Sequence, residues 1–463
     1  MGGLTATPVI PIWQKQVKSM LGTGGDRSED YLTMYDSVSS ALPAIGINWL
    51  DNHRREALTR FRQMGLPKTK DEHWKYTDVR SIARKSFRPQ MIESQFDETL
   101  INNLIIPGIE SHLLLFLDGR WIPQISRCDA LPKGVMVRGL AETLDQSSQR
   151  IKDKLGKALQ ESTHGFNAIN SAFVFDGAFI EIDPDVRLDK PIECVYISSA
   201  QEDLLVLPRN LVWLHTRSEA TLIERYSSLS PTSCLTSAVS EVVIEDEAKL
   251  NFVKFQDESL KSFHIGGSFF EVGREAHLST TTITFGGALV RNDLNVNLNG
   301  AGSQVGLNGL YVGDKSQHID NDTRVSHNAS DTTSHQVYRG ILDGSSRGVF
   351  RGHIEVKPNA QQTNAVQENH NLMLSRQAEA DSMPQLEIYA DDVRCAHGAT
   401  IGQLDDELVF YLQSRGIKKL DAKKILTQAF AKEVLNKLEP ASFRKYLNNR
   451  FEEVLVKKNE FFK

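Results

Sequence analysis

The stretch from Leu207 to Pro384 contains no convincing helical run, and this limits what the chain can fold into. Apolar and polar residues alternate there instead, as where Leu294, Val296 and Leu298 are separated by asparagines. Glycine, asparagine, aspartate or serine interrupts these short runs every several residues. Such a pattern is typical of β-strands bounded by turns. A doubly wound parallel sheet is therefore excluded, because each of its crossovers needs a helix.

Three β architectures remain for this stretch: a sandwich, a propeller and a β-helix. The absence of a sequence repeat disfavours a propeller, since its blades usually carry a recurring signature. The many asparagines beside the expected strands favour a β-helix, in which like side chains stack between successive turns. The alternation pattern alone does not decide between these folds.

Helical periodicity flanks the β region. Before it, apolar residues recur at helical spacing from Trp49 to Met64, and Gly65-Leu66-Pro67 is a typical stop signal. Residues 1–40 are rich in glycine, serine and threonine, and we expect them to be poorly ordered or variable. The segment before the β region therefore predicts a small helical cap.

Three short helices are predicted after Leu404. The first begins at an acidic cluster and ends at Arg415-Gly416, with glycine as a left-handed stop. Asp421 is expected to cap the second helix, and Pro440 to open the third. The expected apolar stripe of the second helix consists of Ala422, Ile425, Leu426, Ala429, Phe430 and Val434. These helices form either a partner-docking module or simply a cover for the domain's own core.

The composition indicates the cellular compartment and excludes some classes of binding partner. A formal net charge of −6 argues against a nucleic-acid binder, which needs excess cations to displace phosphate counterions. No apolar run is long enough to span a membrane, and the amino terminus shows no secretory signal. Four widely spaced cysteines without a CxxC motif suit a reducing compartment. We therefore expect a cytoplasmic protein that binds neither nucleic acid nor membranes.

The sequence carries no recognisable nucleotide site. Gly313-Asp314-Lys315-Ser316 lacks the Gly-Lys step of a phosphate-binding loop, and no GxGxxG motif follows a strand and opens a helix. Any dependence on ATP is therefore expected to come from a partner.

Six of the 13 histidines lie between His318 and His397, but most are better explained as hydrogen-bonded side chains on strand faces. His318-x-Asp320-x-Asp322 has the residue types of a hard-cation site, although an Asn/Asp-rich turn explains it equally well. These aspartates also raise the alternative of a carbohydrate-cleaving β-helix enzyme.

Cys395 and His397 differ from the other candidates. Two residues apart on a strand, a thiol and an imidazole project to the same face and offer two ligand atoms for a soft metal. Two ligands do not complete a four-coordinate site, so the remaining ligands must come from another segment or another chain. A buried structural cysteine is the alternative interpretation.

The segment from Pro384 to Ile417, reading PQLEIYADDVRCAHGATIG and then LDDELVFYLQSRGI from Leu404, closely resembles the C-terminal signature of the SufB/SufD family of iron–sulfur cluster assembly proteins. Shorter segments agree with that family in the same order: Gly65-Leu-Pro with EHWKYT from Glu72, GGALVRNDL from Gly286, SHQVYRG from Ser334, and Gln361 with Gln367. Gly398-Ala-Thr after the histidine is similar to the SufD branch. The resemblance runs from about residue 50 to 435.

The resemblance implies a mainly β protein with a right-handed parallel β-helix core and helical domains at both ends. The expected divisions are a variable segment 1–40, a helical domain 41–112, the β-helix 113–395 and a helical domain 396–463 that docks an ATPase. The implied role is that of a non-enzymatic scaffold on which nascent iron–sulfur clusters are built. A SufB-like subunit would pair with the β-helix end, and SufC-like ATPases would bind the helical tail.

Carried over residue by residue, the resemblance implies that His397 faces the SufB-like partner and helps to hold the nascent cluster, with Cys395 as a less certain neighbour. Tyr411, Arg415, Ile425, Leu426 and Phe430 would form or support the ATPase-docking surface. Thr236-Ser237 replaces an asparagine expected in the family, which weakens any functional claim there. A homodimeric stand-alone scaffold is an alternative to the SufB-like pairing.

Overall fold

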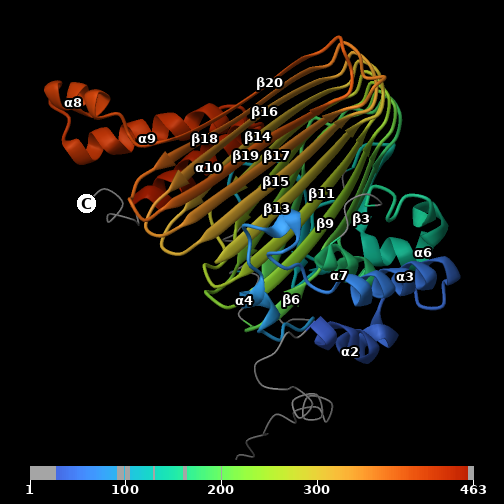
Figure 1. The fold of residues 1–463 in the computed structure, drawn as a ribbon. Coiled ribbons are helices and arrows are strands. Elements are labelled where there is room, and N and C mark those ends of the chain that lie inside the picture. Colours follow the sequence, from blue (N-terminus) through green and yellow to red (C-terminus); the bar gives the residue numbers. More distant parts are fainter. Residues whose placement is uncertain are drawn as a thin grey trace, which may run out of the picture.

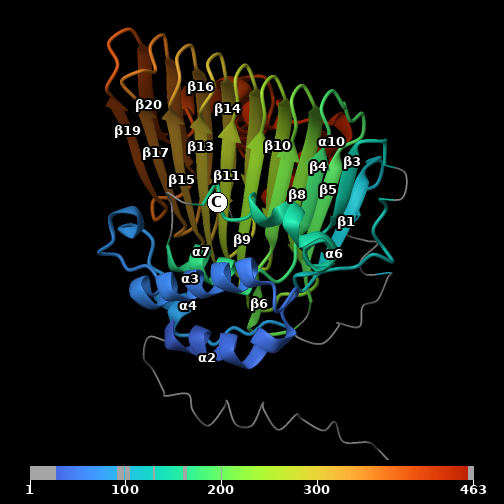
Figure 2. The ribbon, with the colours of Figure 1, turned by 90° about the vertical axis from the view of Figure 1, so that its right-hand side faces the viewer.

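The computed structural model describes residues 28–90, 99, 105–128, 131–159, 164–199 and 201–456. Two large sheets form its body, and their strands advance from β1 and β3 at one end to β19 and β20 at the other (Figures 1 and 2). The first sheet has the order β2 (Arg120–Trp121), β1 (His112–Leu117), β5 (Ile192–Ser198), β8 (Glu219–Ser228), β10 (Lys249–Asp257), β12 (His277–Thr284), β14 (Gln304–Gly313), β16 (Thr333–Leu342), β18 (Asn364–Met373) and β20 (Arg394–Gly402).

The second sheet has the order β19 (Glu379–Ile388), β17 (Arg347–Val356), β15 (His318–His327), β13 (Leu289–Leu298), β11 (Phe263–Val272), β9 (Cys234–Ile244), β7 (Arg209–Leu214), β4 (Ala178–Ile182) and β3 (Val135–Gly139), with β6 (Leu204–Val206) beside β9. The named strands pair in parallel except β1 with β2 and β3 with β4. Because the chain passes alternately from one sheet to the other, it forms a β-solenoid of about eight turns. This confirms the parallel β-helix.

Stacked residues of neighbouring turns lie about 30 positions apart in sequence, yet the turns do not repeat in sequence. Asn299 accepts a hydrogen bond of 2.8 Å from Asn328, 29 residues later. Inside the solenoid, the Gln367 amide donates to Gln336 over 2.9 Å, 31 residues earlier. These ladders are the stacked amides that the asparagine-rich strands predicted. They satisfy polar side chains that the turn-to-turn geometry would otherwise leave unpaired.

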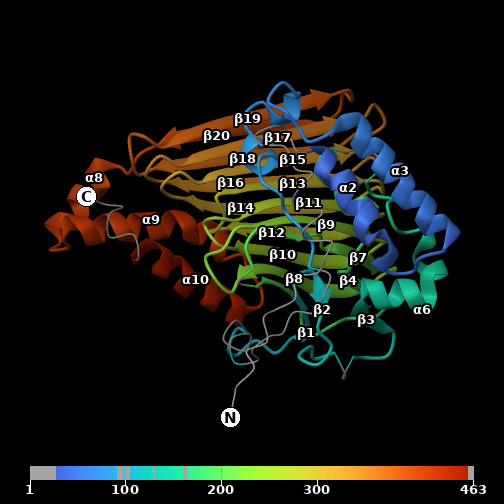
Figure 3. The same cartoon turned by 90° about the horizontal axis from the view of Figure 1, so that it is seen from below.

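The amino-terminal helices cover the outer face of the second sheet (Figures 1 and 3). This group contains α2 (Ser28–Val38), η1 (Ser39–Ala41), α3 (Asn48–Met64), η2 (Glu72–Trp74), α4 (Arg80–Ala83), α6 (Leu140–Lys152) and α7 (Gly165–Phe173). The predicted helix from Trp49 to Met64 is confirmed as α3, which stops at Gly65 with φ of 65°. Aromatic side chains of α7 pack against Phe263 and Ile265 of β11, so these helices share an apolar core with the sheet.

A buried carboxylate fastens this helical group to the second sheet. Glu241 on β9 is 1% exposed and forms an ion pair with the fully buried Arg209. Its two oxygens also accept hydrogen bonds from the backbone amides of Gly156 and Ala158, over 2.8 and 3.0 Å. The charge is therefore paired and hydrogen-bonded, as a buried charge must be.

The carboxyl-terminal helices are α8 (Asp406–Ser414), α9 (Lys419–Leu435) and α10 (Ala441–Val456). The last part of α9 and α10 lie against the first sheet, on the opposite side of the solenoid, while α8 packs on α9 (Figure 3). Phe443, Leu447 and Phe451 of α10 are buried in a core with Phe255 and Phe285 of the sheet. Among the residues that the structure describes, no helix is long and apolar enough to cross a lipid bilayer.

Several predicted boundaries are wrong. Residues 28–40, expected to be poorly ordered, form α2 and part of η1, while residues 1–27 lie outside the described residues. Helices α6 and α7 interrupt the segment 113–395 that was assigned wholly to the β-helix. The β-helix also continues past residue 395, because β20 pairs with β18 as far as Gly402. Lys418, and not Asp421, is the N-cap of α9.

A buried histidine makes stability depend on pH. His327 is fully buried, and its two ring nitrogens lie 2.7 and 2.9 Å from the hydroxyls of Thr332 and Ser334. Burial lowers its pKa from 6.5 to about 4. Between pH 6.5 and pH 4 the unfolded chain is therefore protonated at this histidine, whereas the folded chain is not. The free energy of unfolding consequently falls as pH drops from about 6.5 towards 4.

We therefore expect His327→Gln to flatten the fall in the free energy of unfolding between pH 6.5 and pH 4. The change in slope should approach about 1.4 kcal/mol per pH unit. Urea unfolding at several pH values measures it, with His335→Gln at an exposed imidazole as the control. An H327Q variant whose stability falls with pH as steeply as that of the unchanged protein would contradict this assignment.

Candidate functional site

The last turn of the β-helix ends without a covering element in the described residues. β19 and β20 stand at the ends of their two sheets, and each pairs with only one neighbouring strand. No residue of β19 or β20 is buried, and β20 is exposed at every residue except Cys395. The preceding strands β17 and β18 each contain several buried residues. Figure 2 shows these two strands at the left end of the solenoid. The side chains that would point into the lumen therefore reach the surface here.

Cys395 and His397 belong to this open end. In the register of β20 with β18, Cys395 lies beside Ala365 and His397 beside Gln367. Ala365 and Gln367 are completely buried inside the solenoid. Because side chains in register on neighbouring strands share a face, Cys395 and His397 continue the lumen row. The pair lies on one face of a strand, as its spacing predicted.

Cys395 and His397 differ in solvent exposure. His397 is exposed, while Cys395 is half-buried and packs against the main core. Burial raises the pKa of the Cys395 thiol, which favours the neutral form. A metal that binds this sulfur must therefore displace the thiol proton.

A row of polar side chains lies directly behind His397. Gln367 donates to Gln336, whose amide in turn donates to the hydroxyl of Thr323 over 2.6 Å. Gly352 makes room for this row, because a Cβ there would lie 1.8 Å from the Gln367 nitrogen. Gln367 Oε1 is buried and has no hydrogen-bond partner among the described residues. It is an acceptor that can orient the imidazole of the neighbouring His397.

The described residues contain no group of three or more His, Cys, Asp or Glu side chains that could hold a metal ion. Cys395 and His397 are thus two donors without a further protein ligand of those types beside them. A soft metal held at this end would need its other ligands from outside the described part of the chain.

The second candidate surface lies on α8 and the start of α9, which project beyond the solenoid (Figure 1). Tyr411 is 53% exposed, and the Arg415 guanidinium lies 5.3 Å from its ring centroid. Ile425 on α9 is 42% exposed. Three predicted docking residues therefore lie on the surface.

Leu426 and Phe430, predicted for the same surface, are half-buried instead. Phe430 packs on the protein's own core, and the Arg339 guanidinium lies 4.6 Å from its ring. The predicted stripe does not form a single face: its members Ala422 and Val434 are buried, whereas Ile425 and Ala429 are exposed. Sequence reasoning missed three exposed apolar residues on α8 and at the start of α9: Leu408, Phe410 and Leu420.

The His318-x-Asp320-x-Asp322 motif lies on β15 and not in a turn. Asp320 is 1% exposed and is bonded to Arg291 and to the Thr77 hydroxyl. Asp322 is also paired with Arg291, at 2.8 Å. The two carboxylates are therefore engaged by a guanidinium and are not arranged around an open cation site. His318 is half-buried and His327 is buried, and both are hydrogen-bonded, as expected for histidines on strand faces.

Comparison with known proteins gives a consistent result. Residues 196–430 match the family model "SUF system FeS cluster assembly, SufBD core domain", and residues 25–194 match "SufBD protein N-terminal region". The iron–sulfur cluster assembly protein SufD of Escherichia coli (strain K12) is 30% identical, over 83% of this chain and 88% of that protein. An iron–sulfur cluster assembly SufBD family protein of Synechocystis is 28% identical, over 85% and 89%. SufD of Bacillus subtilis (strain 168) is 25% identical, over 92% and 98%.

The two matched regions together cover the amino-terminal helices, the β-helix and most of α9. The chain therefore belongs to the SufBD family of the SUF iron–sulfur cluster assembly system and is a homologue of SufD.

Proposed function

We propose that this chain is the SufD-like subunit of a cytoplasmic scaffold that builds iron–sulfur clusters, and that it has no catalytic site of its own. The observation that carries the proposal is the open last turn of the β-helix, where Cys395 and His397 continue the lumen row beyond the last covered strand. The cluster is the cargo of this site, held transiently and shared with a partner.

The open end supports pairing with a SufB-like subunit. β19 and β20 present unpaired strand edges, which are templates for another chain unless they are covered. Ile388 and Ile401 lie in register with the lumen residues Val356 and Asn371, and they are 41% and 53% exposed. A partner of the same fold would bury these side chains and bring its own ligands to Cys395 and His397.

The helical tail supports docking of a SufC-like ATPase. This chain has no phosphate-binding loop, so ATP hydrolysis must occur in another subunit. The exposed apolar residues on α8 and α9 provide a surface separate from the β-helix end. ATP hydrolysis in the docked subunit would reorient the two β-helix subunits and expose the cluster site.

A homodimeric scaffold is the second candidate, because the same open end fits a second copy of this chain. The carbohydrate-enzyme alternative has less support, since Asp320 and Asp322 are held by Arg291.

Co-expression with a SufB-like and a SufC-like chain tests the pairing. We expect all three to co-purify, and Ile401→Asp to weaken retention of the SufB-like chain by about tenfold or more, because it would bury an unpaired charge. The ATPase should remain bound. Ile45→Asp is the control, since Ile45 is 52% exposed but lies before α3, away from β19 and β20.

Full retention of the SufB-like chain by I401D would contradict pairing through this end. A wild-type chain that forms only a homodimer in the presence of both other chains would support the stand-alone alternative.

A further inference from the structure

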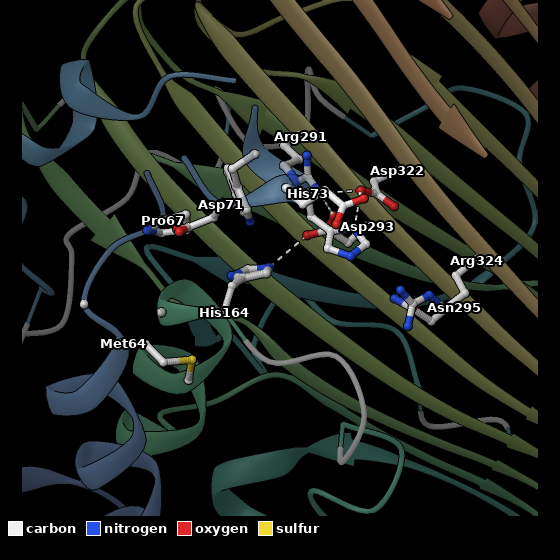
Figure 4. Close-up of a pocket in the computed structure, with 14 residues that line it drawn as sticks. Met64, Pro67, Asp71, His73, His164, Arg291, Asp293, Asn295, Asp322 and Arg324 are labelled. Carbon is white, nitrogen blue, oxygen red and sulfur yellow. Dashed lines mark hydrogen bonds and ion pairs between the residues drawn. The ribbon is translucent and has the colours of Figure 1, made fainter. Parts of the chain in front are cut away.

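A second solvent-accessible site lies away from the β-helix end. A cavity of about 460 Å³ opens between the amino-terminal segment 64–74 and the outer face of the second sheet (Figure 4). Its walls come from the end of α3, from η2, from the start of α7, and from β13 and β15. The volume falls in the range of small-molecule pockets, about 300–1,000 Å³.

The acidic side chains at the base of this cavity are already paired. Arg291 on β13 forms ion pairs with Asp293 and Asp322, both at 2.8 Å, and also with Asp320. The Trp74 ring lies 4.1 Å below its guanidinium. This cluster therefore fastens η2 to the sheet and engages both terminal nitrogens of Arg291 with carboxylates.

Each of the two aspartates that the sheet contributes to the cavity also contacts a histidine. His164 Nε2 lies 2.8 Å from Asp293, and His73 Nδ1 lies 3.5 Å from Asp322. Figure 4 shows both imidazoles around the Arg291 cluster, with a dashed line from His164 to Asp293. The carboxylates are thus compensated by Arg291 and by two imidazoles.

Arg324 and Asn295 form a different wall of the cavity. They are in register on β15 and β13, so their side chains share the outer face of the sheet. Figure 4 shows them together, apart from the Arg291 cluster. Both are half-buried, and neither has a hydrogen bond or an ion pair with any other residue that the structure describes.

The neighbour of Arg324 on the other side is His353 of β17, again in register. The positive charge of Arg324 contributes to the lowered pKa of His353, whose main cause is burial. The residues that flank Arg324 across the sheet are therefore an amide and an imidazole, and neither is a carboxylate.

We propose that this cavity binds a small anion through Arg324 and Asn295. A guanidinium offers a planar fork of donors that matches a carboxylate or a phosphate, and the adjacent amide adds a further donor. The shared chemistry is a small molecule bearing a carboxylate or phosphate group, seated between β13, β15 and the segment 64–74. This site is independent of the cluster-binding end.

Calorimetric titration of the purified full chain at low salt tests the proposal, with citrate and pyrophosphate as the two probes. We expect saturable binding of at least one probe to one site. Binding of citrate alone identifies a carboxylate site, and binding of pyrophosphate alone a phosphate site. Arg324→Gln should weaken the binding by about tenfold or more, and Asn295→Ala by a smaller factor.

Arg376→Gln is the matched control, because Arg376 is an exposed arginine in the segment between β18 and β19. Arg324→Lys is a second variant that retains the charge but loses the fork, and it should fall between wild type and R324Q. The proposal is overturned if neither probe binds saturably, if R324Q and R324K both bind as wild type does, or if R376Q loses as much binding as R324Q.

Discussion

Phe410→Asp should release the SufC-like ATPase from this chain, with affinity falling by about 30- to 1,000-fold. Phe410 is 72% exposed on α8, where Tyr411 and Leu408 are also largely exposed. A large aromatic side chain at the centre of an interface typically contributes about 2–4 kcal/mol, and aspartate would add a desolvation cost. Co-purification and surface-immobilised binding measure the loss.

The fold of the variant should be unchanged. Val409 is the buried residue of α8, and the helix keeps its cap, since Asp405 accepts a 2.8 Å hydrogen bond from the amide of Glu407. Leu260→Asp is the control, because Leu260 is 48% exposed in the segment between β10 and β11. Equal recovery of the ATPase with F410D and with L260D would remove α8 from the docking surface.

The strands of the core were predictable because their two signals are local, whereas the choice of a β-helix came from the family resemblance. Alternation of apolar and polar residues marks strands, and a missing helix between strands excludes ordinary parallel folds. The stacked amides at Asn299 and Asn328 show why asparagine recurs beside the strands. The turn length is not visible as a repeat, since each turn is filled by different side chains.

The sequence analysis missed α6 and α7 for two different reasons. In α6, Leu140, Leu144 and Ile151 do recur at helical spacing and could have been recognised. Helix α7 has only nine residues, and all of them are buried, including its polar residues Asn167, Asn170 and Ser171. So short a helix is not stable by itself, and tertiary packing determines it.

The residue types of the candidate site were predictable, but its solvent exposure at the end of the β-helix was not. The spacing of Cys395 and His397 determines that they share a face of a strand. Their exposure depends on the absence of a further turn, which no local pattern encodes. On α9, Leu426 and Phe430 were assigned with Ile425 to one docking surface, but the structure exposes only Ile425 of the three, and small residues such as Ala422 and Ala431 are buried.

The cavity with Arg324 could not have been predicted from spacing. Its walls come from residues 64–74, 164–165, 291–295 and 322–324, which are far apart in the chain. Register between β13 and β15 places Asn295 beside Arg324, and this pairing exists only once the turns have stacked.

His397→Ala is the second large effect that we expect. The variant should still form the complex with a SufB-like and a SufC-like chain, because His397 is exposed on an edge strand and none of the side-chain hydrogen bonds or ion pairs between described residues involves it. The imidazole is nevertheless one of the few donors at the open end, so its removal should lower cluster content by about tenfold or more. His370→Ala is the matched control: it replaces a histidine on the neighbouring strand β18, on the face opposite to the lumen residues Asn369 and Asn371.

The most direct test is the iron and sulfide content of the three-subunit complex purified with H397A, beside wild type and H370A. The proposed shared site predicts an intact complex in all three preparations, with iron and sulfide strongly reduced only in H397A. A complex with H397A that carries as much iron and sulfide as wild type would contradict the proposal that the open end of this β-helix holds the nascent cluster.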